Sequence, residues 1–309
     1  MPENNHNHKR RSHRHHPVNE KNLVVVTLLN LVITATEIAG GIMSGSLALL
    51  SDALHNLSDT FATFIAYLAT IIGKRDANQK KTFGYKRMEI LAALLNAVIL
   101  IVMSVFLLME AYERWQDPQP IKSMIMLVVA MIGLLANLYA VVILKKDAHK
   151  SINVRAAYIH LIGDTLSSVV VIIGGILIYI YRAYWIDPLI TLLISVYIIR
   201  EAFLILKEAV NILMQSAPDN LDLSKVKKQV EQIPEVNNMH HFHAWMLTDN
   251  EIHMEAHVEL KNDLKLSELK TTQVEIETLL HKEFKINHFT LQFEYQTNHS
   301  PTLIHQEKR

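Results

Sequence analysis

Cysteine is absent from this chain of 309 residues, and neither sign of charge is in excess. Without cysteine the chain cannot form a disulfide framework, a thiolate zinc finger, an iron–sulfur cluster or a cysteine nucleophile. Its 30 Lys and Arg residues balance 30 Asp and Glu residues, which argues against nucleic-acid binding through bulk positive charge. Charged residues make up 19% of the chain, against about 25% in a typical soluble protein. Half of all residues are hydrophobic.

Long apolar runs dominate the first two thirds of the chain. Six segments, separated by short polar breaks, are each long enough to cross ~30 Å of hydrocarbon as a helix that rises ~1.5 Å per residue. The segments are residues 23–43, 47–73, 88–113, 121–144, 152–181 and 187–212. The sequence thus predicts an α-helical membrane protein with six transmembrane helices, in a domain of residues 23–213.

Lys and Arg residues are distributed unequally among the breaks. The N-terminal tail and the loops after the second and fourth segments together hold 15 of them, whereas the remaining loops hold three. Because basic residues in short loops stay on the cytoplasmic side, we expect a multi-pass protein of the cytoplasmic membrane with both termini in the cytoplasm. An even number of spans, such as six, satisfies this orientation.

The two ends of the chain differ from the apolar region. Residues 1–22 are polar, basic and rich in histidine, without the apolar core of a signal peptide, and we expect a disordered cytoplasmic tail. After residue 213, ten Lys and Arg residues stand against fifteen Asp and Glu residues, a net charge of −5, so that the preceding part has +5. We assign residues 214–296 to a soluble cytoplasmic domain and residues 297–309 to a flexible C-terminal tail.

Periodicity divides the soluble domain into short elements. In chain order they are a helix over 221–232, strands over 239–247 and 252–260, a helix over 266–282 and a strand over 287–295. Ser224 is the expected cap of the first helix. The order αββαβ is typical of a small sheet with helices on one face, which is an α+β domain.

Two of the apolar segments contain the same polar pair. The second has His55 and Asp59, and the fifth has His160 and Asp164. Residues i and i+4 lie on one face of a helix, so an imidazole and a carboxylate can converge on one ion. Two such helices side by side offer two nitrogens and two oxygens, a tetrahedral set that suits Zn²⁺. A single pair would more simply form an intrahelical hydrogen bond, but its recurrence in two spans favours a metal transport site.

Carboxylates inside a membrane need a partner. An ionised Asp at mid-depth costs roughly 2.5–3.5 kcal/mol on insertion scales, and a divalent cation compensates this cost. Metal binding requires deprotonated ligands, so protons can occupy the same ligands once the metal has left. The site is therefore suited to the exchange of a metal ion for protons. Asp52, Glu37 and Asn30 are expected to line an access path or to support the ligands.

A second group of histidines lies in the soluble domain. The predicted strands carry His240, His241, His243, His253, Glu255 and His257. Alternation places His241 and His243 on one face and His240 on the other. Strand pairing would bring His240, His257 and Glu294 together as a metal site, and the alternative is a solvated surface with scattered histidines. The N-terminal histidines would form a low-specificity chelator, or be incidental to a disordered tail.

These motifs resemble those of the cation diffusion facilitator family, and most closely its bacterial zinc, cadmium and cobalt exporters. The resemblance rests on GSLALLSDALHNLSD at 45–59, on TFGYKRMEIL at 82–91, on the pair in the fifth segment, and on HHFHAW and QFE in the soluble domain. It covers nearly the whole chain after the N-terminal tail.

The resemblance implies a homodimer with six spans per subunit and a cytoplasmic ferredoxin-like domain that binds metal and helps the subunits to dimerise. It also implies proton-coupled export of Zn²⁺ by alternating access. The family's transport site carries over to this chain as His55, Asp59, His160 and Asp164.

The cytoplasmic site of the family carries over as His240, His257 and Glu294. Some relatives have His and Asp at the last-strand positions, where this chain has Gln292 and Glu294. Some also hold metal in the loop after the second span. Residues 74–81 of this chain contain no histidine, so we expect no such site here.

We therefore expect proton-coupled efflux of divalent metal cations, zinc first and also cadmium and cobalt, with the lipid bilayer and a second subunit as partners. Zinc would be the transported and regulatory ion, not a cofactor. A membrane metal sensor or store, a passive metal channel and a membrane metallohydrolase are alternatives. The sequence has no G-x-x-x-x-G-K-[ST], H-E-x-x-H or G-x-S-x-G motif, so we expect no enzymatic activity. Four protein ligands would also leave no position for a hydrolytic water.

Overall fold

The computed structural model describes residues 20–145, 152–296 and 302–303. Nearly all of the expected N-terminal tail lies outside the described residues, as do His149 and most of the expected C-terminal tail. Within that last segment, the carbonyl oxygens of Thr302 and Leu303 accept hydrogen bonds from the backbone N–H groups of His241 and Phe242.

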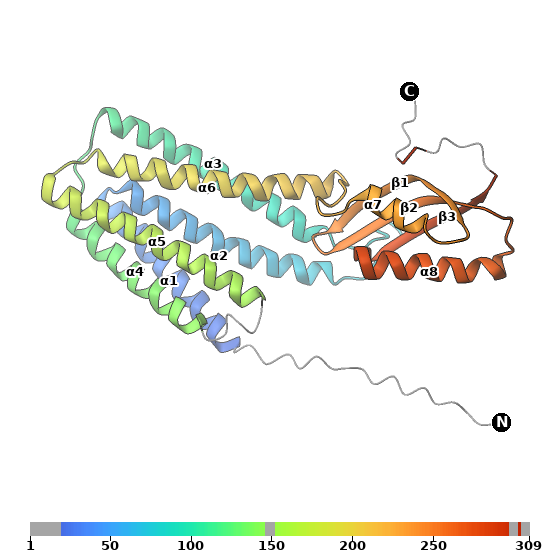
Figure 1. Ribbon diagram of the computed structural model, residues 1–309. Helices are drawn as coiled ribbons and strands as arrows, with labels where there is room; N and C mark the ends of the chain where they lie inside the picture. Colours follow the sequence, from blue (N-terminus) through green and yellow to red (C-terminus); the bar gives the residue numbers. More distant parts are fainter. Residues whose placement is uncertain (1–19, 146–151, 297–301, 304–309) are drawn as a thin grey trace. The chain divides into compact units, whose positions relative to one another are not determined.

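Six long helices form the apolar part of the chain. They are α1 Glu20–Ser44, α2 Leu47–Gly73, α3 Met88–Gln116, α4 Ser123–Lys145, α5 Ile152–Tyr181 and α6 Ile186–Leu213, each within a turn of the predicted segment (Figure 1). Five of them, all except α2, are apolar and long enough to span a membrane. With 27 residues α2 has the length, but Asp52, His55, Asn56 and Asp59 lower its mean hydropathy.

The chain divides into two compact units, and the borders fall inside α2, α3 and α6. One unit comprises Met1–Phe61 and Leu100–Arg200, and the other comprises Ala62–Ile99 and Glu201–Arg309. Each of these three helices begins in one unit and ends in the other, so one end of each belongs to the same unit as the sheet.

Close packing in the first unit depends on small residues and on one cap from a distant helix. Helix α4 packs against both α1 and α5. Gly40 of α1 lies so near α4 that a Cβ on Gly40 would be 2.6 Å from the Val129 side chain. At the start of α6, the Asp187 carboxylate accepts hydrogen bonds from the Leu47 N–H at 2.7 Å and the Ala48 N–H at 3.2 Å. Asp187 thus caps the first turn of α2 from 140 residues away in sequence.

The second unit contains a three-stranded sheet covered by two helices, and the predicted αββαβ order is confirmed. The elements are α7 Leu223–Val230, β1 Val236–Thr248, β2 Glu251–Leu260, α8 Leu266–Phe284 and β3 His288–Tyr295. The strand order is β1-β2-β3, with β1 antiparallel and β3 parallel to β2. Both helices and all three strands contribute to one apolar core, which includes Val226, Phe242, Met254 and Ile276.

Two local expectations for this unit were wrong. The cap of α7 is Asp222, whose carboxylate accepts from the N–H groups of Ser224 and Lys225, so the helix begins one residue before the expected capping residue. In β1, a register shift lies between His240 and His243, and His241 has φ 51°. This bulge interrupts the alternation that placed His240 and His241 on opposite faces.

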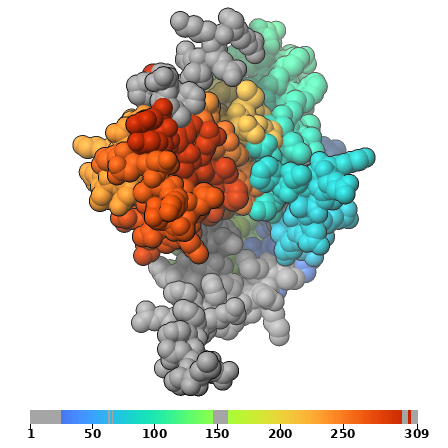
Figure 2. All heavy atoms as spheres, turned by 90° about the vertical axis from the view of Figure 1, so that its right-hand side faces the viewer, coloured from blue at the N-terminus to red at the C-terminus, as the bar shows by residue number. Residues whose placement is uncertain are grey.

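The loop between α2 and α3 contacts the tip of the β1–β2 hairpin within the second unit. Lys86 Nζ lies 2.7 Å from Glu251 Oε2, and the Phe83 ring meets the His253 ring edge-on at 5.5 Å. Figure 2 shows this loop in cyan beside the orange residues of the sheet domain. Partial burial alone would raise the pKa of Glu251, but the hydrogen bond and charge of Lys86 hold the pKa below its ordinary value.

Candidate metal centre

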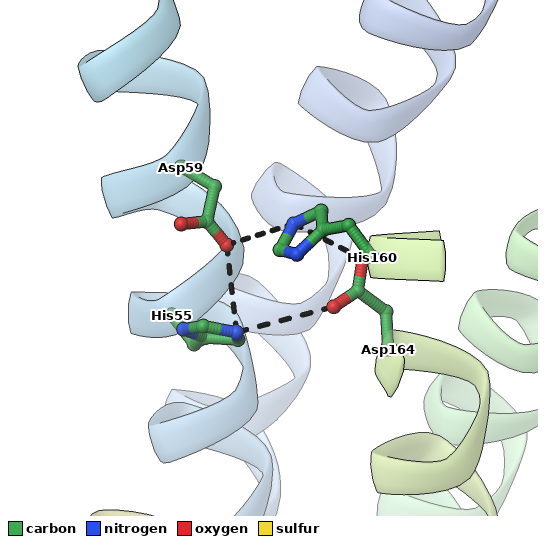
Figure 3. A group of neighbouring side chains, drawn as sticks. All are labelled: His55, Asp59, His160 and Asp164. Carbon is green, nitrogen blue, oxygen red and sulfur yellow. Dashed lines mark ion pairs between the residues drawn. The ribbon is translucent and has the colours of Figure 1, made fainter. Parts of the chain in front are cut away.

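Four side chains from α2 and α5 meet in the first unit. His55 and Asp59 project from α2, and His160 and Asp164 project from α5, so that the two pairs face each other (Figure 3). One ligand atom from each residue lies within 4.8 Å of those of the other three. The His-x-x-x-Asp spacing explains why each pair shares a helix face, and the packing of α2 and α5 brings the two faces together.

The nitrogen–oxygen distances match those around a tetrahedral ion. Asp59 Oδ2 lies 3.4 Å from His55 Nε2 and 3.1 Å from His160 Nε2. Asp164 lies 3.9 Å from the first imidazole and 3.6 Å from the second. Tetrahedral bonds of about 2.0–2.2 Å place ligand atoms roughly 3.3–3.6 Å apart. The four distances bracket this range, so small side-chain movements suffice to coordinate one ion.

The four residues of the centre differ in exposure, from the buried Asp164 to His160, whose side chain is 44% exposed. Asp164 is 3% exposed, and its Oδ2 accepts no hydrogen bond from the described residues. Buried polar atoms normally have partners, so this oxygen calls for a ligand. A cavity of about 790 Å³ is lined by His55, His160 and Asp164, and the rest of its wall comes from α5 and α6. An ion can therefore approach three of the four residues through it.

Neighbouring polar residues support the centre without joining it. Ser167 donates to Asp52 Oδ1 at 2.5 Å, and Asn56 Nδ2 donates to Glu37 Oε2 at 2.9 Å. The threonines that follow the two pairs in sequence donate to backbone carbonyls of their own helices, at 3.0 Å for Thr60 and 2.7 Å for Thr165. Their hydroxyls are therefore engaged within the helices.

A second cluster lies in the sheet domain. His240 and His257 are partners across β1 and β2, and Glu294 of β3 reaches both of them. Its Oε1 lies 2.7 Å from His257 Nδ1, and its Oε2 lies 3.5 Å from His240 Nε2. Gln292 donates to the same carboxylate at 2.8 Å. Ligand atoms of the three residues lie within 4.8 Å of one another.

The other histidines of the strands take different places. The His241 ring stacks on the His257 ring, with 4.6 Å between their centroids. The alternation expected from the sequence did not predict this contact, because it did not include the bulge in β1. His243 and Glu255 are exposed. His253 is buried beside Trp245, and burial lowers its pKa although Glu251 opposes the shift.

Comparison with known proteins gives matches over nearly the whole described chain. The family model of the cation efflux transmembrane domain matches residues 23–214, and that of the cytoplasmic domain of cation efflux proteins matches residues 218–296. The chain is 39% identical over 283 residues to the metal cation efflux system protein CzcD of Cupriavidus metallidurans. This match covers 92% of this chain and 89% of that protein.

Two further relatives have names that state what they transport. The chain is 38% identical over 271 residues to the zinc transporter ZitB of Escherichia coli, covering 86% of this chain and 84% of that protein. It is 35% identical over 301 residues to the cadmium, cobalt and zinc/H(+)-K(+) antiporter of Bacillus subtilis, covering 96% of each.

Proposed function

We propose, since the chain belongs to the cation efflux family, that it exports zinc first, and also cadmium and cobalt, in exchange for protons. The family consists of transporters and not enzymes, and the chain is a multi-pass protein of the cell membrane with a cytoplasmic C-terminal domain. The observation that carries the proposal is the group His55, Asp59, His160 and Asp164, two nitrogens and two oxygens at tetrahedral spacing.

The donor set favours zinc over harder cations. Mg²⁺ prefers oxygen ligands in an octahedron, whereas imidazole nitrogens with carboxylates suit Zn²⁺ in a tetrahedron. Co²⁺ and Cd²⁺ accept the same mixture of donors, and relatives of this chain are named for zinc, cadmium and cobalt.

Charge balance at the site favours exchange with protons. A divalent cation with the carboxylates of Asp59 and Asp164 sums to a formal charge of zero. Two protonated imidazoles, on His55 and His160, with the same carboxylates also sum to zero. Asp59 Oδ2 lies within 3.4 Å of both imidazoles, so it can accept a hydrogen bond from either when the metal is absent. Exchange of one metal ion for two protons thus leaves no uncompensated charge in the bilayer.

The two domains of the chain have different functions in this proposal. We assign residues 23–213 to the transport domain, whose helices would rock to expose the site alternately to each side. Residues 214–296 form the cytoplasmic domain, and its family supports a homodimer. His240, His257 and Glu294 would bind a regulatory metal ion there, with Glu294 joining the two imidazoles.

Zinc uptake by proteoliposomes with an imposed pH gradient tests the transport site. The wild type should accumulate zinc, and Asp59→Ala and Asp164→Ala should each lose uptake, because each removes a ligand and a compensating charge. Asp263→Ala is the matched control, since this exposed residue lies in the loop before α8. Unchanged uptake in both site variants would contradict the proposal.

A further inference from the structure

The loop between α2 and α3 is strongly basic and lies at the membrane surface. Residues 74–87 contain six Lys and Arg residues and a single acidic residue, Asp76. The loop contacts the cytoplasmic domain through Lys86 and Phe83, so it lies on the cytoplasmic side of the membrane. Helix α3 follows the loop directly and is a candidate membrane span from Met88 onward. The loop is therefore at the level of the lipid headgroups of the cytoplasmic leaflet.

A cavity of about 220 Å³ lies beside this loop in the second unit. Its wall is formed by the loop, the first turn of α3, Gln215 after α6 and the end of β1. Three cations line it, Lys81, Lys86 and Arg87, together with the aromatic rings of Phe83, Tyr85 and Trp245 and the apolar side chains of Met88 and Leu91. Positive charge beside aromatic and apolar side chains suits a lipid headgroup and the start of its acyl chains.

Two of the three cations have no acidic partner in the described chain. Lys86 is paired with Glu251. Lys81 Nζ lies 4.3 Å from the centre of the Tyr85 ring, and neither Lys81 nor Arg87 forms an ion pair with a described residue. The Nε of Arg87 is buried, and it has no hydrogen-bond partner among the described residues. Buried polar atoms normally have partners, so this guanidinium calls for an anion.

The local fold holds these cations in place and keeps the site positive. The Gly84 N–H donates to the carbonyl oxygen of Lys81 at 2.9 Å, and Gly84 has φ 71°, a conformation that favours glycine. Arg87 immediately precedes α3, whose N-terminus adds positive potential. The adjacent acidic residue, Glu89, does not line the cavity, and its carboxylate accepts a hydrogen bond from Thr70 at 2.7 Å.

We propose that this cavity binds the phosphate headgroup of an anionic phospholipid from the cytoplasmic leaflet. The Arg87 guanidinium donates to the phosphate oxygens, and Lys81 adds a second positive charge. Leu91, which is 45% exposed, leads from the cavity along α3 and gives the acyl chains an apolar path into the bilayer. A lipid held here connects the start of α3 with β1 of the cytoplasmic domain. The inference does not depend on the metal–proton exchange proposed above.

Native mass spectrometry of the detergent-solubilised full-length protein tests the site, by titration with dioleoyl phosphatidylglycerol and, in parallel, with dioleoyl phosphatidylcholine. The wild type should bind phosphatidylglycerol more tightly. Lys81→Gln and Arg87→Gln should each weaken this binding about fivefold, because each removes one positive charge near the membrane surface. Arg87→Lys keeps the charge but not the planar fork, and it should lose less. Lys81 is exposed, so Lys81→Gln tests the site even if Arg87→Gln fails to fold.

Lys80→Gln is the matched control, since Lys80 is an exposed neighbour in the same loop that does not line the cavity. It should bind phosphatidylglycerol as the wild type does. An equal loss in Lys80→Gln and Lys81→Gln would indicate an unspecific effect of loop charge and overturn the inference. Equal binding by the wild type and both cavity variants, or equal binding of the two lipids, would overturn it too. Inorganic phosphate that binds as tightly as the lipid would identify a site for a soluble anion, which also overturns the inference.

Discussion

Asp59→Asn should weaken zinc binding at the transport site strongly while keeping the shape of the side chain. Asp59 Oδ2 lies 3.1 Å from one imidazole and 3.4 Å from the other, so it occupies one vertex of the proposed tetrahedron. Structural zinc sites bind with about 10–16 kcal/mol, and four comparable ligands each account for about 2.5–4 kcal/mol. The expected loss is therefore on the order of 10²–10³-fold in Kd.

Calorimetry or chelator competition at constant pH measures this loss in the purified protein. The comparison is best made in a His257→Ala background, so that the proposed cytoplasmic site does not contribute. Asp117→Asn is the matched control, because Asp117 is an exposed residue of the α3–α4 loop and its nearest polar partner is Gln119. A change below about tenfold in Kd, with unaltered stoichiometry, would refute the assignment of Asp59 as a ligand.

Three further predictions concern other parts of the chain. Asp187→Ala should lower the free energy of unfolding by about 1–3 kcal/mol, because the first turn of α2 loses its cap. A drop in Tm of the detergent-solubilised protein would show this, and an unchanged Tm would contradict it. His257→Ala should remove one bound zinc per subunit in equilibrium dialysis and leave the other; retention of both would contradict the cytoplasmic site. Lys86→Met should destabilise the protein by less than about 1 kcal/mol at neutral pH, as the pair with Glu251 is partly exposed. Because Lys86 holds the pKa of Glu251 down, this loss should be present above the ordinary pKa of Glu251 and disappear as pH falls through the folded-state value. Chemical unfolding across that pH range measures it, and a loss that persists in acid would contradict it.

The helices and their order could be predicted because the signals that specify them are local. Each span is a long apolar run bounded by short polar breaks, and the observed helices follow those runs within a turn. The αββαβ order followed from the change of period between alternating and helical segments. Helix α2 shows the limit of a hydropathy average, since the residues that interrupt its apolar character include His55 and Asp59.

Features that depend on tertiary packing were not predictable from spacing. The His-x-x-x-Asp repeat predicts which two residues share a helix face, but only the contact of α2 with α5 brings Asp59 to His160. The capping of α2 by Asp187 joins residues far apart in the chain. The bulge at His241 depends on pairing with β2 and changes which rings meet His257. The cap of α7 does not depend on tertiary packing. Asp222 is a common capping residue two positions before Ser224, so it could have been predicted from the sequence.

Simultaneous recording of zinc uptake and luminal pH in proteoliposomes tests the central claim most directly. An antiporter should move protons outward as zinc enters, at about two protons per zinc ion if the charge balance at the four ligands holds. An inward-directed zinc gradient alone should drive proton movement, and an opposing pH gradient should slow zinc entry. Zinc flux without proton movement, or flux that is unaffected by the pH gradient, would contradict the account and indicate a passive channel.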